Sequence, residues 1–184
     1  MEKIKLQKAF AEGFIFYILS TLTVTIQFLF YLLDSPRLSM MDGGGWLFYV
    51  TAACSHAALW ALIPYLMAMV VWLAFRRERA ATIVHIVLAA LLNLLAYIDG
   101  SVYSLYKFHI NGFVLSLLFG EGNSEIFTFS FWLYLKMAGI VLGVFAANVL
   151  LRMLAGRCYA RFHRCGFRPA LAVLVLFALF SNLY

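Results

Sequence analysis

Charged residues are scarce in this chain. Asp, Glu, Lys and Arg together make up 12% of its 184 residues, whereas hydrophobic residues make up 65%. An average soluble domain carries roughly 25% charged residues. With a mean hydropathy of +0.94, the composition excludes an ordinary soluble domain and predicts an integral membrane protein.

Cysteines and acidic residues are also few. The three cysteines imply no disulfide framework, and Cys158, His163 and Cys165 match no zinc-binding spacing. The eight acidic residues are too dispersed to supply the converging ligands and activated nucleophile that metal-dependent hydrolysis or group transfer requires. A transporter is disfavoured because only one charged residue lies well inside an apolar run. We therefore expect no metal, no cofactor and no catalytic residue.

Long apolar runs dominate what is present. Runs of about 20 residues, enough to cross a hydrocarbon core, occupy residues 13–33, 46–75, 80–98 and 126–151, and a shorter run occupies residues 169–184. The expected fold is an all-α membrane protein, a bundle of five transmembrane helices in one domain over residues 1–184. Because the chain stops inside the fifth run, we expect it to be the N-terminal part of a longer protein.

Lys and Arg collect on one side of these runs. Eleven of the fourteen lie near the N-terminus or in the connections after the second and fourth runs, which predicts a cytoplasmic N-terminus and a C-terminus on the opposite face. The net charge of +6 does not indicate nucleic acid, because these residues lie beside the anionic inner leaflet.

Four of the arginines follow a helical spacing. Arg157, Arg161, Arg164 and Arg168 are separated by four, three and four residues, so they form one stripe on a helix. This stripe is predicted to contact anionic lipid phosphates or an acidic partner. The alternative is that it reflects only the preference for positive residues on the cytoplasmic side.

Small residues recur in the fourth run. Gly139, Gly143 and Ala147 occupy every fourth position, which allows another helix to approach closely. We expect this face to pack inside the bundle rather than to form a dimer.

Lys136 is the one charge deep in the fourth run. Its depth of about 15 Å at 1.5 Å per residue exceeds comfortable snorkelling. We expect either a lipid or partner contact or an ion pair. The acidic residues on its side of the bilayer are Asp99, Glu121 and Glu125.

A polar segment interrupts the apolar background at residues 99–112, DGSVYSLYKFHING. If the third helix continues past Ile98, its acid and tyrosines share one face, and the tyrosines suit headgroup depth while the lysine suits a phosphate. Gly112 is expected to let the chain turn, so that residues 113–119 form an interfacial or re-entrant helix. The alternative is an aromatic belt with a helix-capping acid. The predicted lipid or partner contacts are Asp99, Tyr103, Tyr106, Lys107, His109 and Asn111.

These residues also carry a resemblance to a known family. The pattern comprises Ile98-Asp99, Val102-Tyr103, Tyr106, Phe108 to Asn111, and an acidic Gly/Asn turn at 120–125. Similar positions elsewhere are Tyr49-Val50, Ser55-His56, Pro64-Tyr65 and the arginine-rich segment before Pro169-Ala170. On these residues the chain resembles, over essentially its whole length, the N-terminal membrane domain of inner-membrane sulfatase-like proteins of the YejM (PbgA) type. It departs from that pattern at Lys107 and at Gly112, where proline is expected.

The resemblance implies a five-helix domain of the bacterial inner membrane, followed by a basic linker and a periplasmic domain of the alkaline phosphatase and sulfatase superfamily. It implies a noncatalytic role in lipopolysaccharide and envelope lipid homeostasis. The implied partners are an anionic phospholipid or lipid A, and a membrane adaptor protein that directs proteolysis of the lipid A deacetylase. The alternative function is a simple membrane anchor for a periplasmic sulfatase or a phosphoethanolamine or phosphoglycerol transferase.

Overall fold

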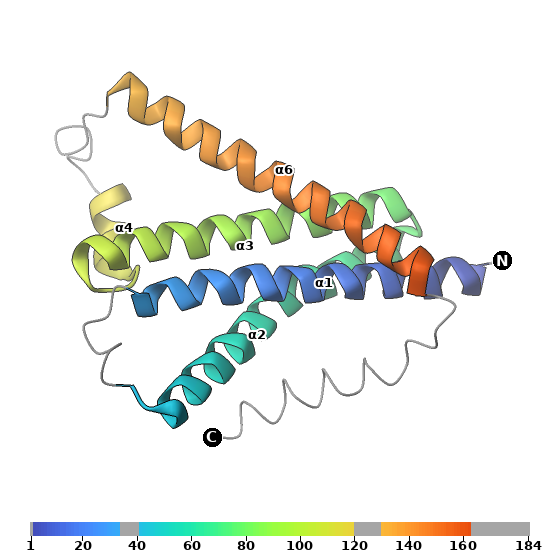
Figure 1. Cartoon of the computed structure of the whole chain (residues 1–184). Helices are drawn as coiled ribbons and strands as arrows, with labels where there is room; N and C mark the ends of the chain where they lie inside the picture. The colour runs from blue at the N-terminus through green and yellow to red at the C-terminus, as the bar shows by residue number, and fades with distance from the viewer. Residues whose placement is uncertain (1, 34–40, 120–129, 163–184) are drawn as a thin grey trace.

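Helices make up most of the described chain. The computed structural model describes residues 2–33, 41–119 and 130–162, and no strand occurs within these ranges. The helices are α1 (Glu2–Leu33), α2 (Gly43–Phe75), α3 (Glu78–Tyr106), α4 (Gly112–Phe119) and α6 (Phe131–Phe162) (Figure 1). Four of them, α1, α2, α3 and α6, are long and apolar enough to cross a membrane. The prediction of an all-α membrane protein is confirmed by these four helices, while the fifth expected span, residues 169–184, lies outside the described residues.

The helices run further than the apolar runs that predicted them. Helix α1 begins at Glu2, α3 continues to Tyr106, and α6 continues to Phe162. An apolar run marks the part of a helix that suits hydrocarbon, whereas backbone hydrogen bonding can carry the helix on into the polar interface. The predicted helix after the third span is present as α4.

Helix α2 is capped at both ends, and a tight turn joins it to α3. Asp42 caps the start of α2 by accepting a hydrogen bond from the Gly45 amide at 2.7 Å. At the other end, Arg76 has φ 54° and its amide donates to the Trp72 carbonyl, while its guanidinium carbon lies 5.1 Å from the centroid of the Trp72 ring. This left-handed residue ends the helix, and α3 starts at Glu78.

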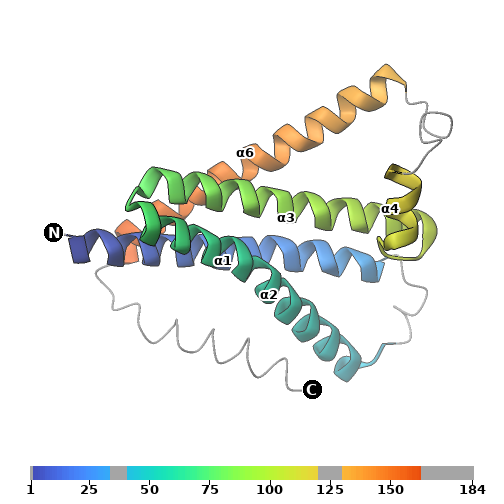
Figure 2. The ribbon, with the colours of Figure 1, turned by 180° about the vertical axis from the view of Figure 1, so that it is seen from behind.

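The four long helices are packed at one end and spread at the other. Helix α1 contacts α2, α3 and α6, and it lies alongside α3 while α2 and α6 lean away on either side (Figures 1 and 2). We call the end where α1 begins the N-terminal end, and the end where α1 finishes the Asp99 end. The divergence of α2 and α6 increases towards the Asp99 end.

Small side chains allow the close packing near the N-terminal end. Phe16 of α1 is fully buried against Ala89 of α3 and Ala155 of α6, both of which are 0% exposed. Ala9, Trp72 and Ala81 form a second buried cluster across α1, α2 and α3. Alanine leaves room for the neighbouring backbone, so three helices converge there on α1.

An ion pair of low exposure also holds this end together. Arg152 Nη2 of α6 donates to Glu12 Oε2 of α1 at 2.8 Å, and the two side chains are 12% and 10% exposed. Lys8 Nζ lies 3.6 Å from Glu12 Oε1 and 3.7 Å from Glu78 Oε1 of α3. Arg152 directly follows the fourth apolar run and is one of the eleven basic residues expected near the N-terminus or in connections, but it lies inside α6 and binds an acid of α1.

The small-residue face of α6 has no neighbour among the described residues. A Cβ atom built on Gly139 or on Gly143 meets nothing within 4 Å, and Ala147 is exposed. The contact between α6 and the bundle lies further along, where Asn148 and Ala155 are buried. The part of the chain that the structure describes therefore does not show the internal packing expected for Gly139, Gly143 and Ala147.

Candidate functional site

Asp99 lies at the centre of a polar cluster at the Asp99 end. Its Oδ2 atom accepts hydrogen bonds from the Tyr31 hydroxyl at 3.0 Å and from His109 Nδ1 at 2.8 Å, and its Oδ1 atom accepts from the Ile110 amide at 2.7 Å. An ionised carboxylate offers about four lone-pair sites, so three are occupied. Asp99 therefore fixes the chain that follows α3 against α1.

A left-handed residue brings His109 and Ile110 back to Asp99. Helix α3 continues past Ile98, as the sequence pattern required, and ends at Lys107, which has φ 58° and whose amide donates to the Tyr103 carbonyl at 2.8 Å. The turn was expected at Gly112, but no left-handed φ occurs at that glycine. The reversal lies five residues earlier, because the hydrogen bonds to Asp99 hold the chain immediately after Lys107.

Aromatic rings surround the carboxylate. The rings of Tyr103 and His109 are stacked with centroids 4.8 Å apart, and Tyr31 meets His109 edge to face at 5.4 Å. The Lys107 ammonium lies 5.8 Å from the centroid of the Tyr103 ring, a distance typical of a cation–π contact. The predicted contact residues Tyr103, Lys107 and His109 thus lie together with Asp99, although the sequence did not predict that His109 would meet Asp99.

Two further predicted contact residues, Tyr106 and Asn111, are not among the partners of Asp99 described above. Tyr106 is 64% exposed and stacks on Phe108 with centroids 5.7 Å apart, so it is separate from the Asp99 hydrogen bonds. Asn111 Oδ1 accepts from the Phe113 amide at 3.0 Å, and this side chain caps the start of α4. The structure gives Asn111 a local structural role and leaves Tyr106 on the surface.

Tyr31 and Gly100 were not identified from the sequence. Tyr31 links α1 to Asp99, and a Cβ atom on Gly100 would lie 3.0 Å from Tyr31 Cε1. The glycine is therefore needed for the close approach of the Tyr31 ring. Tyr31 could have been suspected because it lies near the end of the first apolar run, at the same predicted depth as Asp99.

The remaining predicted contact residues lie on α6 or beyond it. Lys136 is exposed, and the described residues include no ion pair between it and Asp99; Glu121 and Glu125 lie outside those residues. Arg157 and Arg161 are exposed near the end of α6, so half of the predicted stripe is on one helix. Arg164 and Arg168 lie outside the described residues.

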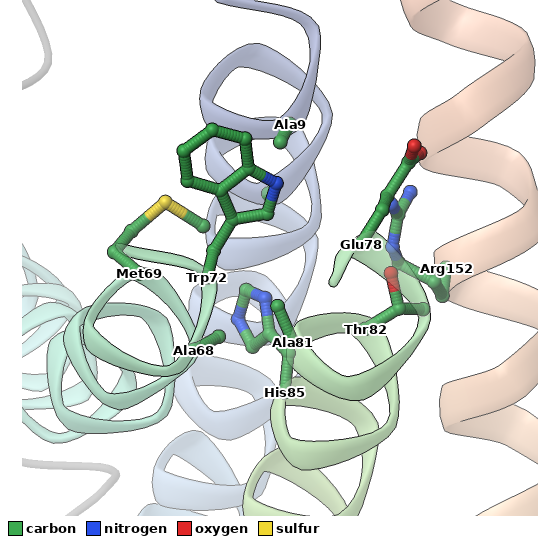
Figure 3. Close-up of a pocket in the computed structure, with 10 residues that line it drawn as sticks. Ala9, Ala68, Met69, Trp72, Glu78, Ala81, Thr82, His85 and Arg152 are labelled. Atoms are coloured by element: carbon green, nitrogen blue, oxygen red, sulfur yellow. The ribbon is translucent and has the colours of Figure 1, made fainter. Parts of the chain in front are cut away.

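Two spaces differ in their capacity for a ligand. Near the N-terminal end, a cavity of about 10 Å³ lies beside His85, Trp72 and Arg152 (Figure 3), which is the space that one water molecule requires. His85 is 2% exposed and packs edge to face on Phe16 at 4.6 Å. At the Asp99 end, a groove of about 320 Å³ lies between α1 and α2 and includes Asp99 in its wall. A further groove of about 600 Å³ lies beside Tyr31, Gly100 and Ser104. The groove between α1 and α2, which also has the size of a ligand site, is the one that includes Asp99.

The fold and this groove define a multi-pass helical membrane protein with a polar, aromatic site at one end of its bundle. Among the described residues, no group of three or more His, Cys, Asp or Glu side chains could hold a metal ion. The chain belongs to the family described as a domain of unknown function (DUF3413), which it matches over residues 2–184. No curated protein matches the chain.

Proposed function

We propose that this chain is a noncatalytic domain of the bacterial inner membrane that regulates lipopolysaccharide and envelope lipid homeostasis through lipid and protein contacts. The observation that carries the proposal is the Asp99 cluster. Its hydrogen bonds hold the turn after α3, so that Lys107 and Tyr106 remain exposed at a helix end. A lysine and tyrosines at the end of a membrane-spanning helix suit a phospholipid headgroup.

The sulfatase-like resemblance supplies the biological context of this proposal. It puts the N-terminal end in the cytoplasm and the Asp99 end in the periplasm, with residues 169–184 as a fifth span. The proposed lipid is an anionic phospholipid or lipid A, and the proposed protein partner is a membrane adaptor. The distribution of Lys and Arg supports the same orientation.

A complementation experiment tests this regulatory role. Residues 1–184 are expressed in cells that lack the parent gene, and envelope integrity and lipopolysaccharide content are measured. We expect rescue by the natural sequence and loss of rescue with Lys107→Ala. Arg79→Ala is a matched control, because it removes one exposed positive charge at the opposite end. No rescue by a stably inserted chain would leave the simple membrane anchor as the function.

The basic stripe is a second proposed contact, at the other end of α6. Arg157 and Arg161 are exposed there, where anionic lipid phosphates can reach them if this end faces the cytoplasm. Reversing both charges to Glu is expected to weaken binding to vesicles containing phosphatidylglycerol. Unchanged lipid binding and unchanged capture of the adaptor would remove the stripe from the proposal.

A further inference from the structure

The groove between α1 and α2 has an unusual lining for a membrane protein surface. It has a volume of about 320 Å³ and is bordered by aromatic rings together with the Asp99 carboxylate and the imidazoles of His56 and His109. The aromatic side chains are Phe28 and Tyr31 from α1 and Tyr49 and Trp60 from α2. The groove lies between α1 and α2, two helices that diverge towards the Asp99 end (Figure 2).

The two tyrosine hydroxyls in the groove wall already donate hydrogen bonds within the protein. The Tyr49 hydroxyl donates to the Phe28 carbonyl at 2.8 Å, and the Tyr31 hydroxyl donates to Asp99 Oδ2 at 3.0 Å. Neither hydroxyl therefore has a hydrogen left to offer to a ligand.

The His56 tautomer follows from its neighbour. His56 Nδ1 lies 2.9 Å from the Ala52 carbonyl oxygen. Because a carbonyl oxygen can only accept, Nδ1 must carry the hydrogen, and Nε2 of the neutral ring carries a lone pair. His56 lines the groove, so its neutral ring adds an acceptor to the groove wall.

The groove thus offers a ligand the His56 acceptor, the remaining lone pair of the Asp99 carboxylate, which His109 also binds, and the faces of aromatic rings. This combination attracts an organic cation, because N–H groups can donate to His56 and Asp99 while the positive charge lies against the rings. An anionic group would meet the Asp99 carboxylate and would find no free hydroxyl donor at Tyr31 or Tyr49.

We propose that this groove binds the ammonium group of an ethanolamine phospholipid. This inference rests on the proposed lipid contact at the Asp99 end and names the headgroup. Further along α2 from His56, Leu59 and Ile63 are 50% and 53% exposed, and this apolar surface suits acyl chains. Lys107 lies over Tyr103 at the same end, where it can bind the lipid phosphate. The exposed apolar side chains of α2 favour a lipid over a lysine side chain of a partner protein.

Photo-cross-linking in nanodiscs tests the assignment. The chain of residues 1–184 is reconstituted in phosphatidylcholine containing a small fraction of diazirine-labelled phosphatidylethanolamine, phosphatidylglycerol or phosphatidylcholine. Cross-links to the α2 peptide around residues 56–63 are then measured by mass spectrometry. We expect about tenfold more labelling by phosphatidylethanolamine than by phosphatidylglycerol, the ratio that corresponds to one strong cation contact.

Two substitutions separate the groove from the general lipid surface. His56→Leu removes the acceptor and Trp60→Leu removes a ring, and each should reduce the preference for phosphatidylethanolamine several-fold. Trp132→Leu is the matched control for Trp60→Leu, because Trp132 is an exposed tryptophan of α6 and its replacement should leave the preference unchanged.

The outcomes distinguish this inference from the broader proposal. Labelling of the groove by phosphatidylglycerol equal to or above that by phosphatidylethanolamine would overturn the ammonium site while leaving a lipid contact at the Asp99 end. Cross-linking of α2 to a partner lysine, to residues 169–184 or to a second copy in place of lipid would also overturn it. Failure of cellular rescue with the ethanolamine preference intact would refute the regulatory function alone.

Discussion

The two ends of the bundle differ in how closely the helices pack and in how the charged side chains are arranged. Near the N-terminal end, alanines let three helices converge on α1, and Arg152 is neutralised by Glu12 across the helix contact. At the Asp99 end, α2 and α6 lean away, and the charged groups are arranged around one turn instead of between helices. The difference indicates that stability is concentrated at the first end, while the second end retains surface for a ligand.

The largest expected change in stability comes from breaking the ion pair between α1 and α6 near the N-terminal end. Arg152→Ala removes the hydrogen-bonded partner of Glu12 at low exposure and leaves Lys8 3.6 Å away, which should reduce the free energy of unfolding by about 3 kcal/mol. Thermal unfolding in detergent measures the change. Arg157→Ala on the same helix should change stability by less than about 0.5 kcal/mol, because that side chain is exposed. Equal effects of the two substitutions would show that the pair does not hold α6.

The glycines of the two ends should respond differently to a larger side chain. A Cβ atom on Gly13 lies 3.2 Å from atoms of both Met69 and Tyr65, whereas one on Gly143 meets nothing within 4 Å. Gly13→Leu should therefore destabilise the protein by about 2 kcal/mol through overpacking, and Gly143→Leu should be nearly neutral. The comparison is made by thermal unfolding of both variants. A strong loss of stability in Gly143→Leu would show that α6 is covered by another helix.

The Asp99 cluster should affect local order more than global stability. Asp99→Asn removes the charge that His109 binds and should destabilise the turn by about 1–2 kcal/mol. Hydrogen exchange should accelerate at residues 107–111 and remain unchanged in the middle of α1. Uniform acceleration across the bundle would mean that Asp99 supports the whole fold, and the contrast between the two ends would be lost.

The smallest effects concern the two left-handed residues that end α2 and α3. Arg76 and Lys107 have φ 54° and 58°, a conformation that costs a residue with a Cβ atom about 1 kcal/mol relative to glycine. Lys107→Gly should stabilise the protein slightly and weaken lipid binding, because the cation is lost. Arg76→Gly should gain less, because the contact of Arg76 with the Trp72 ring, at 5.1 Å, is closer than that of Lys107 with the Tyr103 ring, at 5.8 Å. A loss of stability in Lys107→Gly would contradict the assigned backbone strain.

The sequence predicted the features that depend on composition and helical spacing. Four apolar runs correspond to the four long helices, and the spacing of Asp99 and Tyr103 placed them on one face of α3. It did not predict which distant residues meet. Glu12 and Arg152, and Tyr31 and Asp99, are joined by helix packing that no local pattern encodes. The position of the turn was also missed, because a lysine in a left-handed conformation is held there by hydrogen bonds from residues further along the chain.

The most direct test of the central claim is to measure phospholipid retention after detergent removal, by native mass spectrometry of the chain. We predict that the natural sequence retains phospholipid, that the double variant Asp99→Asn, Lys107→Ala retains less of it, and that Arg79→Ala at the N-terminal end retains as much as the natural sequence. Equal retention by all three proteins would contradict a lipid site at the Asp99 end.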